Sequence, residues 1–148
     1  MKLADHFDLS EMILSQEASR RGIANEPNNQ QIGNLRGLCA YILEPLRLSV
    51  GRPIIVSSGF RSAAVNALVG GSKTSDHMAG LAADITIPGM DPIEVCWKIA
   101  ELKLPAKQII HEFRRWTHVS LSKSPAIPPE LLTAMYVGGR AQYSKGLA

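Results

Sequence analysis

The chain has 148 residues, which suits one domain of ordinary size. Hydrophobic residues make up 45% of it, enough for a buried core, so disorder and a disulfide-stapled miniprotein are both excluded. Sixteen Lys and Arg against 13 Asp and Glu leave a net charge of +3, with no run of three basic residues. A protein that neutralises phosphates needs a concentrated basic face, so we expect no nucleic-acid partner.

The first residues and the longest apolar run bear on where the protein is found. Asp5 and Asp8 interrupt the stretch where a signal peptide needs unbroken apolar sequence. The longest apolar run, 38–43, is far shorter than the roughly 18 residues that span a bilayer. We therefore expect synthesis in the cytosol without a signal peptide and no membrane span. Cys39 and Cys96 lack CxxC spacing and are predicted to be buried thiols. No heptad repeat or spare apolar helix requires a partner, so a monomer is expected.

Two helices are predicted in the first fifty residues. Asp8, followed three residues later by Glu11, has the capping-box pattern and opens a helix that runs to Arg21 and ends at Gly22. The second helix has apolar residues at i, i+3 and i+4 spacing, and Pro45 is expected to bend or fray its last turn. Its apolar stripe consists of Ile32, Leu35, Leu38, Cys39, Ile42, Leu43 and Leu46.

Short strands and helices alternate after Gly51. Runs of β-branched and apolar residues predict strands at 54–57, 81–87, 108–113 and 116–121. Helices are predicted at 61–69 and 92–100, and a polar loop at 72–80. The Pro- and Gly-rich tail, 124–148, gives no reliable element. Helices that come first and strands that intermix later predict an α+β fold in a single domain over residues 1–148.

His77, Asp84 and His118 are the candidate metal ligands. Zinc hydrolases hold the metal with three protein ligands, drawn from His and carboxylate, and leave the fourth position to water. Zinc lowers the pKa of its water to about 7, which makes a nucleophile at neutral pH. From spacing alone, the alternative is that two histidines and an aspartate spread over this much sequence have unrelated local roles.

A motif joins two of these residues. All five fixed positions of the pattern S-x-H-x-x-G-x-A-x-D are present in 75–84, from Ser75 through His77 to Asp84. This segment resembles the family of zinc D-Ala-D-Ala carboxypeptidases and bacteriophage L-alanyl-D-glutamate endolysins, to which the van-type D,D-dipeptidases and, more remotely, hedgehog amino-terminal domains are similar. The resemblance implies a small antiparallel sheet with helices packed on it. It also implies a Zn²⁺ cofactor, and Gly80 and Ala82 allow close approach beside the metal.

Two further segments carry the same resemblance. The run 58–62, S-G-F-R-S, is similar to an S-G-[YF]-R-S element whose arginine faces the substrate, and a guanidinium suits a substrate carboxylate. The run 112–120, E-F-R-R-W-T-H-V-S, resembles an ending found in a phage and prophage branch, where the histidine completes the zinc site. The resemblance therefore implies that Arg61 and Ser75 contact substrate and that His118 is the third ligand. The alternative for Arg61 is a solvent-facing side chain at a helix start.

The catalytic base is where the sequence departs from the wider family. In the carboxypeptidases and dipeptidases the acid stands three residues before the last histidine ligand, but Arg115 occupies that position here and cannot accept a proton. Glu112 is the remaining candidate, about 20 Å from His118 along one straight strand. A hairpin loop at 114–116 would instead make the two cross-strand partners about 5 Å apart. Otherwise Glu112 is an exposed carboxylate paired with Arg114 or Arg115. Asp76 is a weaker candidate, for orienting a ligating imidazole.

These features predict a zinc metallopeptidase that cleaves the peptide stems of bacterial peptidoglycan, with Glu112 as general base. The resemblance to phage proteins implies that it acts on the cell wall after release by lysis, or as a virion component. A rival hypothesis is a non-catalytic zinc-containing module that binds the cell wall or has a structural role, and Arg115 is its main support. A third is a soluble domain whose motif is accidental. Carboxypeptidase and endopeptidase action both stay open, as does the bond that is cut.

Overall fold

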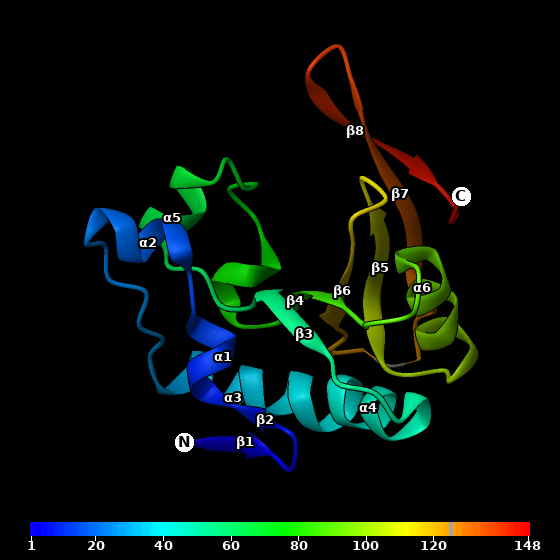
Figure 1. Ribbon diagram of the computed structural model, residues 1–148, viewed down its shortest axis with the longest axis horizontal. Helices are drawn as coiled ribbons and strands as arrows, with labels where there is room; N and C mark the ends of the chain where they lie inside the picture. Colours follow the sequence, from blue (N-terminus) through cyan, green and yellow to red (C-terminus); the bar gives the residue numbers. More distant parts are fainter. Residues whose placement is uncertain (125) are drawn as a thin grey trace.

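A six-stranded sheet organises the part of the chain that the computed structural model describes, residues 1–124 and 126–148 (Figure 1). Its strands lie in the order β3-β4-β6-β5-β7-β8, and all neighbours are antiparallel except β5 and β7, which are parallel. The strands are β3 (Ile55–Ser58), β4 (Ala82–Thr86), β5 (Ala106–Glu112), β6 (Trp116–Leu121), β7 (Glu130–Val137) and β8 (Arg140–Lys145). The α+β prediction is confirmed, but the main sheet is larger than expected and mixed rather than purely antiparallel.

The remaining elements lie around this sheet. A short antiparallel pair forms near the amino terminus from β1 (Lys2–Ala4) and β2 (Phe7–Asp8). The helices are α1 (Leu9–Ile13), α2 (Gln16–Arg21), α3 (Asn29–Leu38), the π-helical η1 (Cys39–Leu43), α4 (Glu44–Val50), α5 (Ala63–Leu68), the 3₁₀ helix η2 (Asp76–Ala79) and α6 (Pro92–Glu101). In Figure 1, α3 and α4 run as one rod below the sheet. Helix α6 packs against β5 and β6. None of the described helices is both long and apolar enough to cross a lipid bilayer.

The first predicted helix is two helices. The capping box at Asp8 is present, because its backbone N–H donates to the Glu11 carboxylate at 2.8 Å. The helix nevertheless stops at Ile13, since the carbonyl of Met12 accepts the N–H of Phe60 at 2.7 Å. The hydroxyl of Ser15 then caps α2, which ends at Gly22 as predicted. The prediction of one continuous helix was therefore wrong at its middle, where a backbone carbonyl accepts a hydrogen bond from a distant part of the chain.

The second predicted helix is confirmed, and its apolar stripe is buried from Leu35 to Leu46. The helical path continues through Pro45 to Val50, so the last turn does not fray. Proline has no N–H to donate to the preceding turn, and the wider π turn of η1 accommodates it. Cys39 and Cys96 are both free thiols in the core, as predicted.

The tail contains two strands that the sequence analysis did not predict. Residues Glu130–Val137 and Arg140–Lys145 form a hairpin, and its first strand pairs with β5, for example Ile110 opposite Leu132. The segment 72–80, predicted as a loop, includes the single turn η2. Strands β4, β6 and β5, which the motifs occupy, are therefore all interior to the sheet.

Candidate active site

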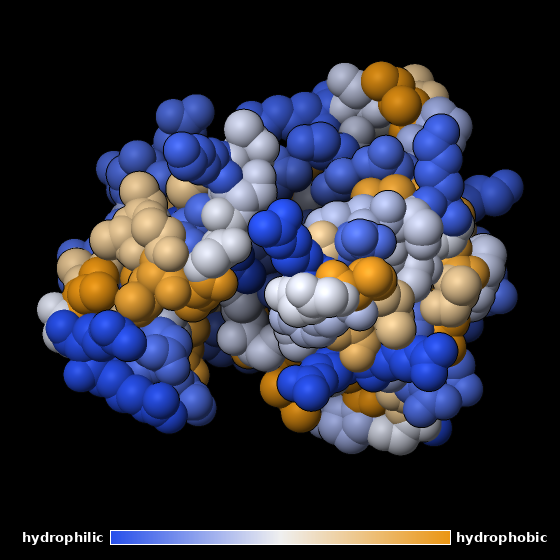
Figure 2. Space-filling view, turned by 90° about the horizontal axis from the view of Figure 1, so that it is seen from above, coloured by the Kyte–Doolittle hydropathy of each residue, from blue (hydrophilic) through white to orange (hydrophobic). Residues whose placement is uncertain are grey.

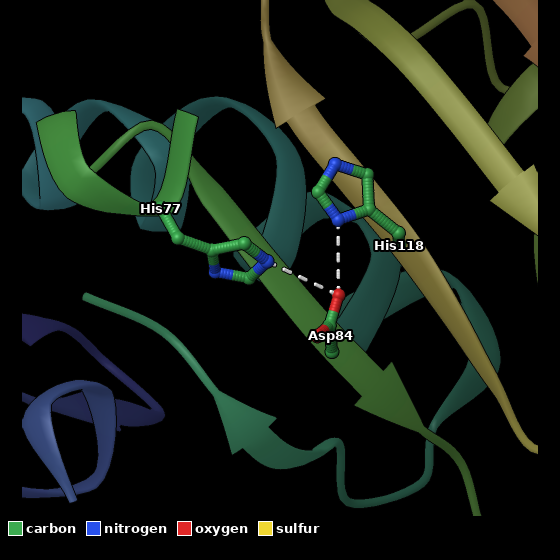
Figure 3. A group of neighbouring side chains, drawn as sticks. All are labelled: His77, Asp84 and His118. Carbon is green, nitrogen blue, oxygen red and sulfur yellow. Dashed lines mark hydrogen bonds and ion pairs between the residues drawn. The ribbon is translucent and has the colours of Figure 1, made fainter. Parts of the chain in front are cut away.

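Three buried side chains converge on one point of the sheet (Figure 3). Asp84 and His118 are directly opposed on β4 and β6, so both project from the same face. His77 approaches from η2, which the hydroxyl of Ser75 caps by accepting the N–H of His77 at 3.2 Å. Asp84 Oδ1 lies 2.9 Å from His118 Nδ1 and 3.3 Å from His77 Nε2. The structure thus brings together the three residues that the motifs single out.

The arrangement fits a zinc ion. One ligand atom from each residue lies within 4.8 Å of the other two. Ligands about 2.0–2.1 Å from a tetrahedral ion are separated by ~3.3 Å, close to the two distances at Asp84 Oδ1. Two imidazoles and one carboxylate are also a ligand set that zinc takes in catalytic sites. This group could therefore hold a metal ion with one coordination position left for water.

The backbone of the Ser58–Ser62 segment orients His77. Nδ1 of His77 lies 2.7 Å from the carbonyl oxygen of Gly59. Because a carbonyl oxygen can only accept a hydrogen bond, Nδ1 carries the hydrogen. The lone pair of Nε2 is then free to face Asp84. Asp76 does not orient an imidazole, contrary to the expectation from sequence, because its carboxylate pairs with Lys107 at 3.0 Å.

Arg61 lies against the second oxygen of Asp84. Its Nη2 is 3.2 Å from Asp84 Oδ2, while Nε and Nη1 donate to Ser58 and Asn66. The guanidinium is therefore held in place, with 16% of the side chain exposed, rather than facing solvent. Burial alone would raise the pKa of Asp84, but His77 and His118 hold it well below its usual range. Burial would lower the pKa of His118, yet Asp84 and Glu112 raise it above its usual value.

Glu112 reaches this group from the next strand. Its carboxylate lies 3.4 Å from His118 Nδ1, and 12% of its side chain is exposed. The loop is one residue earlier than expected, at 113–115, so Glu112 opposes Trp116 and His118 opposes Ile110. Glu112 and His118 are therefore diagonal neighbours on one face instead of direct partners.

No ion pair joins Glu112 to either turn arginine within the described residues, and Arg114 and Arg115 are both exposed. Burial raises the pKa of Glu112 to about 7, and the negative charge of Asp84 adds to this. The positive charges of His118 and Arg61 oppose this rise and lower the pKa. A carboxyl group with a pKa near neutrality, beside a candidate metal ligand, can exchange a proton at working pH.

Several supporting residues were missed from sequence. Buried Asn25 donates to the carbonyl oxygens of Ile13 and Phe60 and accepts the N–H of Ser62, which fixes the segment that carries Arg61. Asn66, also buried, links Arg61 to the carbonyl of Ser72. An isolated asparagine has no periodic signal, so its partners follow only from the fold. Among described residues, the Trp116 indole nitrogen is buried without a hydrogen-bond partner.

Comparison with known proteins agrees with this site. No curated protein matches the chain. The family described as Peptidase M15, whose members are zinc-dependent, matches residues 5–120 and so covers all three candidate ligands, Glu112 and Arg61. The match extends over most of the chain, which belongs to the peptidase M15 family and is a metallopeptidase of that family.

Proposed function

We propose that this protein is a zinc peptidase that hydrolyses amide bonds in the peptide stems of bacterial peptidoglycan. The observation that carries the proposal is the convergence of His77, Asp84 and His118, with Glu112 beside His118. Membership of the M15 family supports the chemistry. The cell-wall substrate rests on the resemblance of 58–62, 75–84 and 112–120 to D-Ala-D-Ala carboxypeptidases and phage endolysins. The same resemblance supports action after phage release or within a virion.

His77, Asp84 and His118 are the residues that would hold zinc. When bound there, zinc supplies a Lewis acid that polarises the scissile carbonyl and makes water nucleophilic at neutral pH. Glu112 takes a proton from the attacking water at its carboxylate and returns it to the leaving nitrogen. A side chain in this role contributes about 10²–10⁴-fold in rate. The Glu112 carboxylate can thus accept a proton, which the cationic side chain of Arg115 cannot do.

Arg61 and Ser75 are proposed to act close to the substrate. Arg61 already neutralises Asp84 Oδ2, and its partly exposed side chain carries its positive charge beside the cluster. That charge suits a substrate carboxylate or the developing oxyanion. Ser75 caps η2 with its hydroxyl, which places it next to His77. Its proposed substrate contact would come in addition to this cap.

The Glu112→Gln variant tests the proposal. Glutamine keeps the shape of the side chain but accepts no proton, so we expect kcat on purified muropeptides to fall by about 10²–10⁴-fold. Zinc content, measured by elemental analysis of the purified protein, should stay at one ion per chain. Mass spectrometry of the digested muropeptides identifies the bond that the parent cuts.

Glu101→Gln is the matched control, because Glu101 is an exposed glutamate at the end of α6, away from the cluster. It should retain full activity. A zinc-loaded Glu112→Gln variant as active as the parent would remove Glu112 from the mechanism. A zinc-loaded parent that cleaves no cell-wall peptide would favour the non-catalytic module instead.

A further inference from the structure

The β7–β8 hairpin brings a tyrosine to the face of the sheet that carries Glu112. In the register of the sheet, Glu112 on β5 opposes Ala134 on β7, and Ala134 opposes Tyr143 on β8. Directly opposed residues project from the same side of a sheet. Tyr143 therefore shares the face of Glu112, although the hairpin lies outside residues 5–120 that the family comparison matches.

The residue between them is small and buried. Two strand spacings of about 4.8 Å separate the backbones at Glu112 and Tyr143, and the methyl group of Ala134 is the only side chain that this row places between them. Glu112 itself leans the other way, towards His118. A substrate that reaches past Glu112 on the side away from His118 would therefore meet the ring of Tyr143.

The charges of the candidate site act on this phenol. Burial raises the pKa of Tyr143, the negative charges of Glu112 and Asp84 raise it further, and Arg61 opposes them. The residue nonetheless stays 56% exposed. Within the described residues its hydroxyl makes no hydrogen bond. The phenol thus keeps its proton, faces open space and lies within the electric field of the cluster.

The surface around these strands is hollowed. Seen from above, a recess separates the part of the molecule built by α1, α2 and α5 from the part built by β5 to β8 and α6 (Figure 2). In Figure 1 the β7–β8 hairpin rises beside the turn between β5 and β6, on the side of the recess opposite α5. The hairpin is therefore placed to form one wall above the cluster.

We propose that Tyr143 is a substrate-binding residue of this site, whose hydroxyl donates a hydrogen bond to a carbonyl oxygen of an extended stem peptide that passes Glu112 on the side away from His118. The inference rests on the proposed function and adds a contact from outside the matched family region. It assigns the hairpin to recognition rather than to proton transfer, which belongs to Glu112.

Binding to an inactive background tests it. The zinc-loaded Glu112→Gln protein is titrated with the synthetic pentapeptide L-Ala-γ-D-Glu-L-Lys-D-Ala-D-Ala, with Kd measured by calorimetry. Adding Tyr143→Phe removes one hydroxyl, and we expect Kd to rise about 5- to 10-fold, as for the loss of one hydrogen bond. Gln142→Ala, on the opposite face of β8, is the matched control and should leave Kd unchanged. Equal zinc content and melting temperature show that each variant is folded.

The active background gives a second readout. Tyr143→Phe alone should raise KM for muropeptides by a similar factor and leave kcat unchanged. An unchanged Kd and KM in the tyrosine variants, with a parent that cleaves and a Glu112→Gln protein that binds, would overturn the role of Tyr143 and leave the peptidase intact. A fall in kcat alone would also overturn a binding role. A parent that neither binds nor cleaves stem peptides would overturn both proposals.

Discussion

The two carboxylate oxygens of Asp84 have different partners. Oδ1 faces both imidazoles, whereas Oδ2 faces the guanidinium of Arg61. A buried carboxylate is costly unless its charge is paired and its lone pairs are used. Arg61 meets that need without occupying the oxygen that a metal would take, and its Nε and Nη1 groups also donate to Ser58 and Asn66.

Arg61→Lys should weaken zinc binding. An ammonium cannot make the three divergent contacts of the guanidinium, so Asp84 would lose its fixed orientation. Loss of a partner of this kind typically costs about 10–100-fold in metal affinity. Competition with a zinc chelator of known affinity measures the effect. Arg20→Lys, at an exposed pair with Glu17, is the control and should bind zinc like the parent. Equal affinities for both variants would contradict the assigned role.

Gly80 is required where the motif turns from η2 into β4. Its φ is +75°, and a Cβ there would lie 2.6 Å from the carbonyl oxygen of Gln31. Gly80→Ala should therefore lower the free energy of unfolding by about 1–3 kcal/mol. Gly33, inside α3, has open space around it, and Gly33→Ala should raise stability by about 0.5–1 kcal/mol. Urea denaturation of both variants checks the prediction, which fails if their changes have the same sign.

Among the elements, the tight turn between β5 and β6 decides where Glu112 lies. The N–H of Arg115 donates to the carbonyl of Glu112 at 3.0 Å, and the two central residues, Phe113 and Arg114, have φ of 56° and 58°. Such turns suit the twist of a hairpin but favour Asn and Gly at both positions. The ring of Phe113 stacks on Tyr136, with centroids 4.1 Å apart, and this contact holds the turn against β7.

Replacing the second turn residue should stabilise the protein. Arg114 is exposed and holds a left-handed conformation that costs a non-glycine residue about 1–2 kcal/mol. Glycine is more flexible in the unfolded chain, and this offsets part of the gain. Arg114→Gly should therefore raise the free energy of unfolding by about 0.5–1 kcal/mol. Arg115→Gly, at ordinary φ, should instead lose stability. Urea midpoints at equal m-value separate the two, and a less stable Arg114→Gly would show that the turn is not strained.

Over the whole molecule, the sequence predicted those features that depend on interactions between residues close together in the chain. The capping box at Asp8, the buried stripe from Leu35 to Leu46 and the spacing from His77 to Asp84 are all visible in the sequence, because each depends on neighbours within one element or motif. The break after Ile13 was not, since the N–H of Phe60 decides it from far along the chain.

The two strands of the tail were not predicted, because they too depend on contacts between distant parts of the chain. Strand β7 forms by pairing with β5 across the fold, and β8 is exposed along its whole length, so neither shows a strong apolar alternation. The turn between β5 and β6 was predicted one residue late, because its two positive φ values fall on Phe113 and Arg114 instead of the usual turn residues. The three-residue loop and the shared face of Glu112 and His118 were still anticipated.

Zinc should stabilise the folded protein as a whole. Its three ligands come from η2, β4 and β6, which the unfolded chain does not hold together. A ligand that binds only the native state at 100 times its Kd adds about 2.7 kcal/mol to the free energy of unfolding. Melting curves with added zinc and with chelator measure the gain, and His118→Ala should abolish it. An equal gain in the parent and this variant would place the metal elsewhere.

The parallel pairing of β7 with β5 also matters for solubility. Without the carboxyl-terminal hairpin, β5 would be the outermost strand on that side, with its free N–H and C=O groups open to pairing with other chains. Loss of the hairpin should then promote self-association through intermolecular strand pairing. The hairpin beside the recess therefore also protects β5 from aggregation. Shortening the hairpin should weaken substrate binding and lower solubility together.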